Sequence, residues 1–307
     1  MRKLWFPFAL ILIAVGVAAF LLFRGRKTSE EGEPKLSPDT AASTQPDENP
    51  ATPPGTQDTA QKPTEEPKKT EPVDADAALR EADAQIAAGK PLAAQKLLTD
   101  ALARDPKLQK PDEFKTRLTK LGEEIFFSSK AFPPLSITCD VVSGDALARI
   151  AAKHRTTIEL IRRINALKSD TLRPGQRLKV VPGGFDVVVD KSQFLLTVYK
   201  NGIWVREFKV GLGKDGSTPV GTFLAGHKLR EPVYFGEGNP IPFSDRKNNP
   251  LGTRWITIQD QYGIHGTWEP DSMGKEQSKG CVRMLNEDVE WLFDLVVPGM
   301  SKVAIKP

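Results

Sequence analysis

The spacing of apolar residues divides the chain into segments of different kinds, beginning with an apolar run at residues 5–23 that carries no charge and is broken only by Pro7. As a helix this run would span about 29 Å at 1.5 Å per residue, close to the roughly 30 Å of a bilayer core. Basic residues flank it on both sides, so the charges do not decide its orientation. The run lacks a clear cleavage site and predicts an uncleaved transmembrane signal anchor within residues 1–27, with cleavage after Ala19 as the alternative.

The next segment, residues 28–75, cannot build a core. It contains nine prolines, and Leu36 and Val73 are its only large aliphatic residues. Such a composition buries too little apolar surface to offset the entropy lost on ordering, so we expect a disordered linker. The linker would act as a tether between the membrane and the domains that follow.

Apolar residues return at helical spacing in residues 76–129. One stripe ends at a break at residues 89–91, a second covers residues 92–102, and a third covers residues 111–125. The pattern predicts a helical hairpin followed by a third helix. The hairpin resembles a single tetratricopeptide unit, and because one unit makes no groove, a packing or spacer role is favoured over partner binding.

The remaining chain changes pattern twice. Residues 135–183 predict the order strand, helix, helix, strand, and the rest is mostly β. The Asn201-Gly202 pair is a hairpin signal, and residues 229–250 form a loop rich in Pro, Gly and Asn, of a length that is often functional. Predicted strands cover residues 187–189, 194–199, 203–210, 222–226 and 255–259, and the one clear helix covers residues 287–296.

Composition and charge narrow the classes of function. The 307 residues carry a net charge of +4, and no basic stripe with interleaved aromatics is present, which argues against nucleic-acid binding. No cluster of His, Cys and carboxylates has metal-ligand spacing, so we expect neither a metal nor a cofactor. The two cysteines, Cys139 and Cys281, fall in different segments, and we expect no disulfide between them.

The densest chemistry lies between His265 and Cys281. A thiol with a pKa of about 8.5 needs a base to become a nucleophile at neutral pH, and an imidazole can take that proton and later return it. Gly280 lets the backbone bend before the cysteine, so that N–H groups can point at a developing oxyanion. These residue types predict an acyl-transfer site with Cys281 as the nucleophile and His265 as the base.

The surrounding motif resembles that of the L,D-transpeptidase, or YkuD, family. The likeness is carried by His265-Gly266-Thr267 and Ser278-Lys279-Gly280-Cys281-Val282-Arg283-Met284, with two upstream blocks at residues 211–223 and 249–252.

That resemblance implies roles for further residues. Gly266 would orient the imidazole through its backbone carbonyl, and Arg283 and Ser278 would bind substrate. Tyr234 would contact the donor peptide from the long loop, which would act as a lid. Many family members have a second histidine where this chain has Lys279, which removes a secondary imidazole but not the base.

Residues 135–183 resemble a LysM domain, and the resemblance implies binding of glycans that contain N-acetylglucosamine. The glycan groove would lie along the loops at residues 144–146 and 165–167. Cys139 stands where an aromatic residue is common in this family.

We therefore expect a multidomain, membrane-anchored L,D-transpeptidase whose catalytic domain lies outside the cytoplasm, in the cell envelope. Its partners would be peptidoglycan stem peptides, glycan strands and the membrane. Cys281 would form a thioester with a stem peptide and pass it to an acceptor amine during cell-wall cross-linking. The alternatives are an L,D-carboxypeptidase, in which water replaces the amine, and an inactive wall-binding scaffold. The expected parts are a transmembrane helix (1–27), a disordered linker (28–75), a short α-helical segment (76–129), a small α+β LysM module (135–183) and a mostly-β L,D-transpeptidase domain (184–307).

Overall fold

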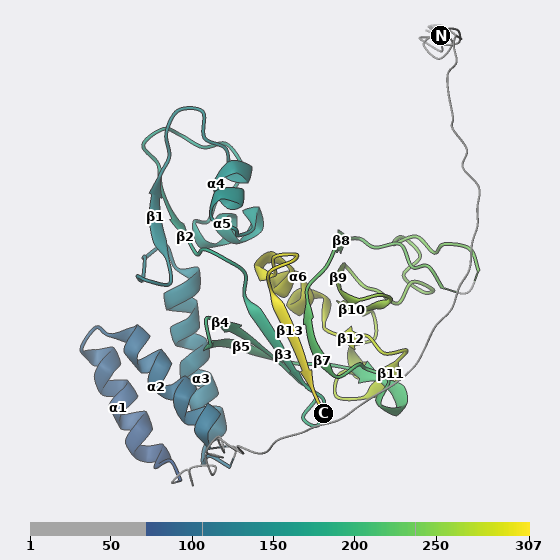
Figure 1. The fold of residues 1–307 in the computed structure, drawn as a ribbon, viewed down its shortest axis with the longest axis horizontal. Coiled ribbons are helices and arrows are strands. Elements are labelled where there is room, and N and C mark those ends of the chain that lie inside the picture. The colour runs from purple at the N-terminus through teal and green to yellow at the C-terminus, as the bar shows by residue number, and fades with distance from the viewer. Residues whose placement is uncertain (1–71, 106, 237) are drawn as a thin grey trace, which may run out of the picture. The chain divides into compact units, whose positions relative to one another are not determined.

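The computed structural model describes residues 72–105, 107–236 and 238–307 (Figure 1). The expected membrane segment and nearly all of the expected linker lie outside these residues. Within the described ranges, no helix is both long and apolar enough to cross a bilayer. The described residues belong to one compact unit, Glu65–Pro307.

Three helices open the described part of the chain, as the apolar stripes predicted. Asp74 caps the first helix, because its carboxylate accepts a hydrogen bond from the Ala77 N–H at 2.9 Å. Pro91 and Pro111 begin the other two, at a position where a missing N–H costs nothing. The third helix continues into a π-helical turn, Glu123–Phe127. The helices are α1 Ala75–Ala87, α2 Pro91–Arg104 and α3 Pro111–Gly122.

The next module has the predicted order of strand, helix, helix and strand. Its two strands pair antiparallel, and both helices contribute to a small apolar core with them. The amide of Asn165 joins the second helix to the second strand through hydrogen bonds of 2.8 Å with Ile161 and Lys179. That side chain, in the expected glycan groove, is therefore bound internally. The elements are β1 Ile137–Asp140, α4 Leu147–Lys153, α5 Ile158–Ile164 and β2 Arg177–Val180.

A five-stranded sheet forms one layer of the last domain, in the order β5-β4-β3-β13-β7. Asn201 and Gly202 have positive φ angles of 51° and 77° and form the turn between β4 and β5, as the sequence predicted. The C-terminal strand β13 lies between β3, to which it is parallel, and β7. The strands are β3 Asp186–Asp190, β4 Leu195–Lys200, β5 Ile203–Lys209, β7 Gly221–Leu224 and β13 Lys302–Lys306.

A second sheet, in the order β12-β10-β9-β8, carries the motif residues. Helix α6 follows it and buries Val289, Leu292 and Leu295, which confirms the predicted helix. The predicted long loop gives its first residues to β8 and otherwise holds one bridge, between Tyr234 and Ile241. The elements are β8 Lys228–Arg230, β9 Arg254–Gln259, β10 Tyr262–His265, β12 Val282–Arg283 and α6 Asn286–Leu295, with the separate pair β6 Leu212–Gly213 and β11 Glu276–Ser278.

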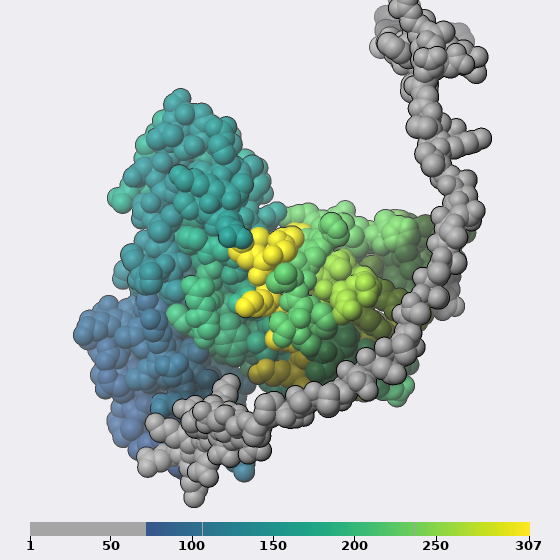
Figure 2. All heavy atoms as spheres, viewed as in Figure 1, coloured from purple at the N-terminus to yellow at the C-terminus, as the bar shows by residue number. Residues whose placement is uncertain are grey.

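Helices α2 and α3 cover the free edge of β5, and α1 packs against α2. Gln95 in α2 donates to the carbonyl of Trp204 at 2.5 Å, and the Trp204 N–H donates to the hydroxyl of Thr99 at 3.2 Å. A Cβ on Gly122 would lie 2.9 Å from the carbonyl oxygen of Val205, so α3 approaches the strand closely. The helices share one apolar core with the sheet, and Figure 2 shows them, in blue, against the green catalytic part. These contacts support the packing role that the sequence favoured.

Candidate active site

Strand pairing brings His265 and Cys281 to one face of the second sheet. His265 ends β10, and Cys281 directly precedes β12, which pairs parallel with β10. The register sets His265 opposite Arg283, two residues after Cys281. Residues two apart on a strand point to the same face, so the imidazole and the thiol share that face.

The imidazole of His265 is buried, with 3% of the residue exposed. Its Nδ1 lies 2.6 Å from the carbonyl oxygen of Gly266, which can only accept a hydrogen bond, so Nδ1 carries the proton. The indole of Trp255 stacks on the ring, with centroids 5.7 Å apart and planes at 17°. Burial lowers the pKa of His265 to about 4, although the Gly266 carbonyl opposes that shift. The residue is therefore neutral at pH 7, with Nε2 as its proton-accepting atom.

Cys281 is a free, half-buried thiol. Burial raises its pKa above the usual value, while the Gly263 N–H and the Arg283 cation act in the opposite direction. Its Sγ donates toward the carbonyl oxygen of Gln261 at 3.9 Å. A neutral base and a protonated thiol on the same face of a sheet are the groups that general-base activation requires.

The side chain of Ser278 stabilises the turn before Cys281. The hydroxyl of Ser278 donates to the Cys281 carbonyl at 2.7 Å and accepts from the Gly280 N–H at 3.1 Å. Gly280 has a φ of 121°, and a Cβ there would lie 2.3 Å from the ring of Tyr262. The position therefore requires glycine. The Gly280 N–H is bound by the Ser278 hydroxyl, and the expectation that N–H groups of this turn hold an oxyanion stays a prediction.

Arg283 places a cation beside both reacting groups. One of its nitrogens lies 2.9 Å from the carboxylate of Glu269, and only 12% of its side chain is exposed. Its Nε is buried and has no hydrogen-bond partner among the described residues. An unused donor of this kind can bind a carbonyl or carboxylate oxygen of a ligand.

The long loop reaches the site through contacts other than Tyr234. Trp268, three residues after His265, is contacted by two loop residues. The ring centroids of Phe243 and Trp268 lie 5.9 Å apart, and the guanidinium carbon of Arg246 lies 4.7 Å from the centroid of the Trp268 ring. Tyr234 is half-buried and pairs with Ile241 within the loop. The contacts found for Tyr234 in the described residues remain within the loop, so its role as a substrate contact stays a prediction.

Asn286, the first residue of α6, is a site residue that sequence reasoning missed. Its side chain accepts from the Thr253 N–H at 3.0 Å and donates to the Thr267 carbonyl at 2.9 Å. A Cβ on Gly252 or on Gly266 would lie 2.3 Å or 2.2 Å from its Oδ1. Asn286 thus braces the segment that orients His265. An asparagine at a helix start is a visible signal, but its partners lie far away in the sequence.

The catalytic domain has one other histidine, His227, and the strand order places it away from the site. His227 is exposed and precedes β8, at the edge of the sheet opposite β12. In the part of the chain that the structure describes, no group of three His, Cys, Asp or Glu side chains could hold a metal ion.

Family models match two segments of the chain, and one solved structure is reported with them. The family model of the L,D-transpeptidase catalytic domain matches residues 184–305, and that of the LysM domain matches residues 139–181. The NMR structure of the catalytic domain from E. faecium L,D-transpeptidase is 23% identical, with a TM-score of 0.33, and the match covers 40% of this chain and 96% of that one.

Two curated relatives span different shares of the chain. A probable L,D-transpeptidase, ErfK/SrfK, of Escherichia coli (strain K12) is 39% identical over 128 residues, which is 37% of this chain and 41% of that protein. A putative L,D-transpeptidase, YkuD, of Bacillus subtilis (strain 168) is 32% identical over 178 residues, covering 55% of this chain and 98% of that protein. With that relative matched over nearly its full length, the chain belongs to the YkuD family of L,D-transpeptidases and carries a LysM domain before the catalytic domain.

Proposed function

We propose that this L,D-transpeptidase acts through a thioester on Cys281 in peptidoglycan cross-linking. The observation that carries the proposal is the neutral, Nδ1-protonated His265 on the same sheet face as the Cys281 thiol. A base in that state can accept a proton at Nε2 without first losing one.

The reaction would proceed in two acyl transfers. His265 Nε2 takes the proton of the Cys281 thiol as Sγ attacks the carbonyl carbon of the donor stem peptide. The C–N bond breaks, the terminal D-amino acid leaves as an amine, and His265 returns the proton to that amine. An acceptor amine then attacks the thioester, gives up its proton to His265, and releases Cys281 as the thiol.

The residues around this pair would hold charge and geometry. Arg283, with its buried unused Nε, would bind an oxygen of the donor peptide. The backbone N–H of Cys281 would face the oxyanion, since the Gly280 N–H already binds Ser278. Ser278 and Gly280 would therefore act by fixing the turn, and Gly266 by orienting the imidazole.

Targeting would come from the rest of the chain. The LysM domain would bind glycan strands, and residues 5–23 would anchor the protein in a membrane with the catalytic domain in the cell envelope. A tether and a glycan binder in one chain raise the effective concentration of the active site near its polymer without new contacts at the site. The proposal also includes the domain boundaries that were predicted from the sequence.

The test separates transpeptidation from hydrolysis. A disaccharide carrying a tetrapeptide stem is incubated with the full chain, with and without an acceptor amine, and the products are resolved by mass spectrometry. The proposal expects a cross-linked product that requires the amine and is lost in Cys281→Ala but kept in Cys139→Ala. Release of the terminal residue at the same rate without any acceptor would identify a carboxypeptidase, and no product with either ligand set would indicate a scaffold.

A further inference from the structure

The strand β6 and the residue before it run beside the turn that carries the nucleophile. Before the strand, Gly211 exchanges two backbone hydrogen bonds with Arg283, at 2.9 and 2.8 Å. Within the strand, Gly213 lies opposite Ser278 of β11. A Cβ on Gly213 would lie only 2.6 Å from the Cα of Gly280, so the two backbones are in direct contact. The position of this strand therefore sets the position of the turn.

The loop after β6, residues 214–218, folds back onto the same turn. The carbonyl oxygen of Ser217 would lie 3.1 Å from a Cβ on Gly280, so this loop also packs directly on the turn. Thr218 is buried, and its hydroxyl accepts a hydrogen bond from the Gly213 N–H at 2.8 Å. The 214–218 loop and β6 thus support the nucleophile turn together.

Lys191, directly after β3, holds the 214–218 loop from the first sheet. Its ammonium group donates hydrogen bonds to the carbonyl oxygens of Gly216 at 3.0 Å and Thr218 at 2.8 Å. Bonds from a charged donor are stronger than those between neutral groups. Asp215, next to Gly216, has a φ of 51°, a conformation that a residue other than glycine keeps only where the surrounding structure fixes it. The two bonds from Lys191 contribute to that restraint.

We propose that Lys191 is a positioning residue for acyl transfer, which acts on Cys281 through the 214–218 loop and the nucleophile turn. The inference rests on the proposed function, in which the Cys281 N–H faces the oxyanion. That N–H stabilises the oxyanion only while the turn holds it at hydrogen-bond distance from the attacked carbonyl oxygen. Removing the ammonium group of Lys191 would release the loop, and the N–H would lose its alignment.

The experiment follows two reactions of the same thiol. A carbapenem acylates Cys281 through a tetrahedral oxyanion. Iodoacetamide alkylates the thiolate by displacing iodide from carbon, and no oxyanion forms in that step. Both reactions are measured on the full chain in detergent, in a Cys139→Ala background that leaves one thiol, at a temperature where every variant is folded.

Three substitutions of Lys191 grade the loss of its contacts. Lys191→Met keeps the length of the side chain and removes the donor. Lys191→Gln is a milder second variant, whose shorter amide cannot reach both carbonyls, and the same outcomes decide it. Lys191→Arg supplies N–H donors at similar reach and is the rescue variant.

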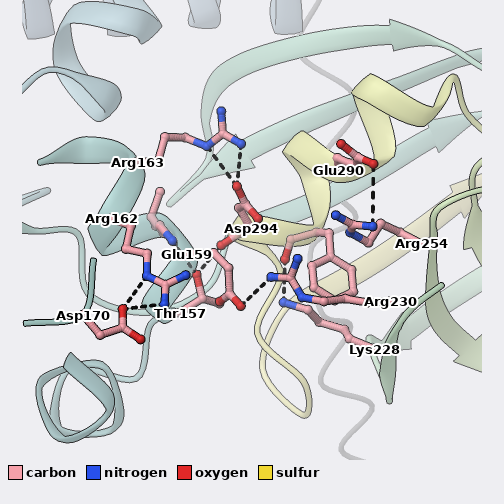
Figure 3. A network of polar contacts seen from close by, with 12 residues as sticks. Thr157, Glu159, Arg162, Arg163, Asp170, Lys228, Arg230, Arg254, Glu290 and Asp294 are labelled. Atoms are coloured by element: carbon pink, nitrogen blue, oxygen red, sulfur yellow. Dashed lines mark hydrogen bonds and ion pairs between the residues drawn. The ribbon is translucent and has the colours of Figure 1, made fainter. Parts of the chain in front are cut away.

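The matched control is Lys228→Met. Lys228 of β8, labelled in Figure 3, also donates to two backbone carbonyls, those of Phe293 at 2.5 Å and Val296 at 2.9 Å. These carbonyls lie at the C-terminal end of α6, and β8 is at the edge of its sheet opposite β12. The control therefore loses the same kind of contact away from the nucleophile turn.

We expect Lys191→Met to lower the limiting rate constant of acylation by about tenfold, less than the roughly 10²–10³-fold lost when an oxyanion donor is removed altogether. The carbapenem concentration at half-maximal rate and the alkylation rate should each change by less than about twofold, because the drug's initial binding and the thiol itself are unaffected. Lys191→Arg should recover most of the acylation rate. Lys228→Met should lose stability and keep both rates.

Several outcomes would overturn the positioning role. These are wild-type acylation by Lys191→Met, an equal loss of acylation in Lys228→Met, an equal loss of alkylation in Lys191→Met, and no recovery in Lys191→Arg. A wild-type protein that is alkylated at Cys281 but never acylated would instead contradict the proposed function, so the two failures are distinguishable.

Discussion

Replacing Asn286 by alanine tests how the catalytic histidine is positioned. The change removes hydrogen bonds of 3.0 Å to the Thr253 N–H and 2.9 Å to the Thr267 carbonyl. A buried polar group left without a partner costs about 1–3 kcal/mol. Since Thr267 is buried and Thr253 is partly buried, we expect the free energy of unfolding to fall by about 2–4 kcal/mol.

The same change should slow acylation beyond its effect on stability. Asn286 touches both Gly252 and Gly266, and the Gly266 carbonyl holds Nδ1 of His265. A shift of about 1 Å in a catalytic group can cost up to about 10²-fold in rate, so we expect acylation by a carbapenem to be about 10–100-fold slower.

Two measurements on the same samples separate these effects. Circular dichroism gives the unfolding free energy, and absorbance at the β-lactam band gives the acylation rate at a temperature where every variant is folded. Glu287→Ala, at the neighbouring exposed position of α6, is the control and should change stability by less than about 1 kcal/mol. Wild-type acylation by folded Asn286→Ala would refute the positioning role, even if stability fell as expected.

Three further predictions follow from the same geometry. His265→Ala should slow acylation by about 10²–10⁴-fold, the usual range for a general base, and Lys279→His should change the rate much less. Equal rates in wild type and His265→Ala would show that another group acts as the base. Because burial lowers the pKa of His265 to about 4, the base stays neutral above that pH. The acylation rate should therefore stay constant from pH 7 to 5 and fall only near pH 4, whereas a fall centred at pH 6.5 would contradict the burial argument. Gly280→Ala should lose both stability and acylation, because its Cβ would lie 2.3 Å from Tyr262 at a φ of 121°. Gly89→Ala, at a φ of 72° with nothing within 4 Å of its Cβ, should lose a smaller amount of stability and no acylation, as melting curves and acylation rates would show.

The sequence predicted the elements that local patterns specify. Helices α1 to α3 and α6 follow from apolar stripes of helical period, and the turn at Asn201 and Gly202 follows from the backbone freedom of these residues. The strands β6 and β12, of two residues each, were not predicted, because their pairing partners lie far away in the sequence. Strands of two residues are too short to show an alternation of apolar and polar residues.

Some residues of the candidate site could be predicted from the sequence, and others could not. His265 and Cys281 could be found from residue types and a family motif, because their chemistry is local to a short segment. The brace at Asn286 and the stacked Trp255 could not be found, because a hydrogen bond or ring contact between distant residues requires the folded sheet. The hydrogen bond from the Gly280 N–H to the hydroxyl of Ser278 was likewise not predicted, although the two residues are close in the sequence.

The LysM and helical segments are built into the catalytic unit through specific contacts. The α2 side chains Gln95 and Thr99 complete the edge of β5, and Thr157 of the LysM domain caps the end of α6. The helix that it caps begins at Asn286. Point substitutions are therefore better probes of each segment than deletions, which would expose these paired groups to solvent.

Intact-mass spectrometry of the protein after incubation with a carbapenem tests the central claim most directly. A β-lactam carbonyl is a strained amide, so a thiol activated by His265 should open it and keep the ring-opened drug as an adduct. The account predicts one adduct per chain on the wild type and on Cys139→Ala, and none on Cys281→Ala. An unmodified wild-type mass, or an adduct that survives in Cys281→Ala, would contradict it.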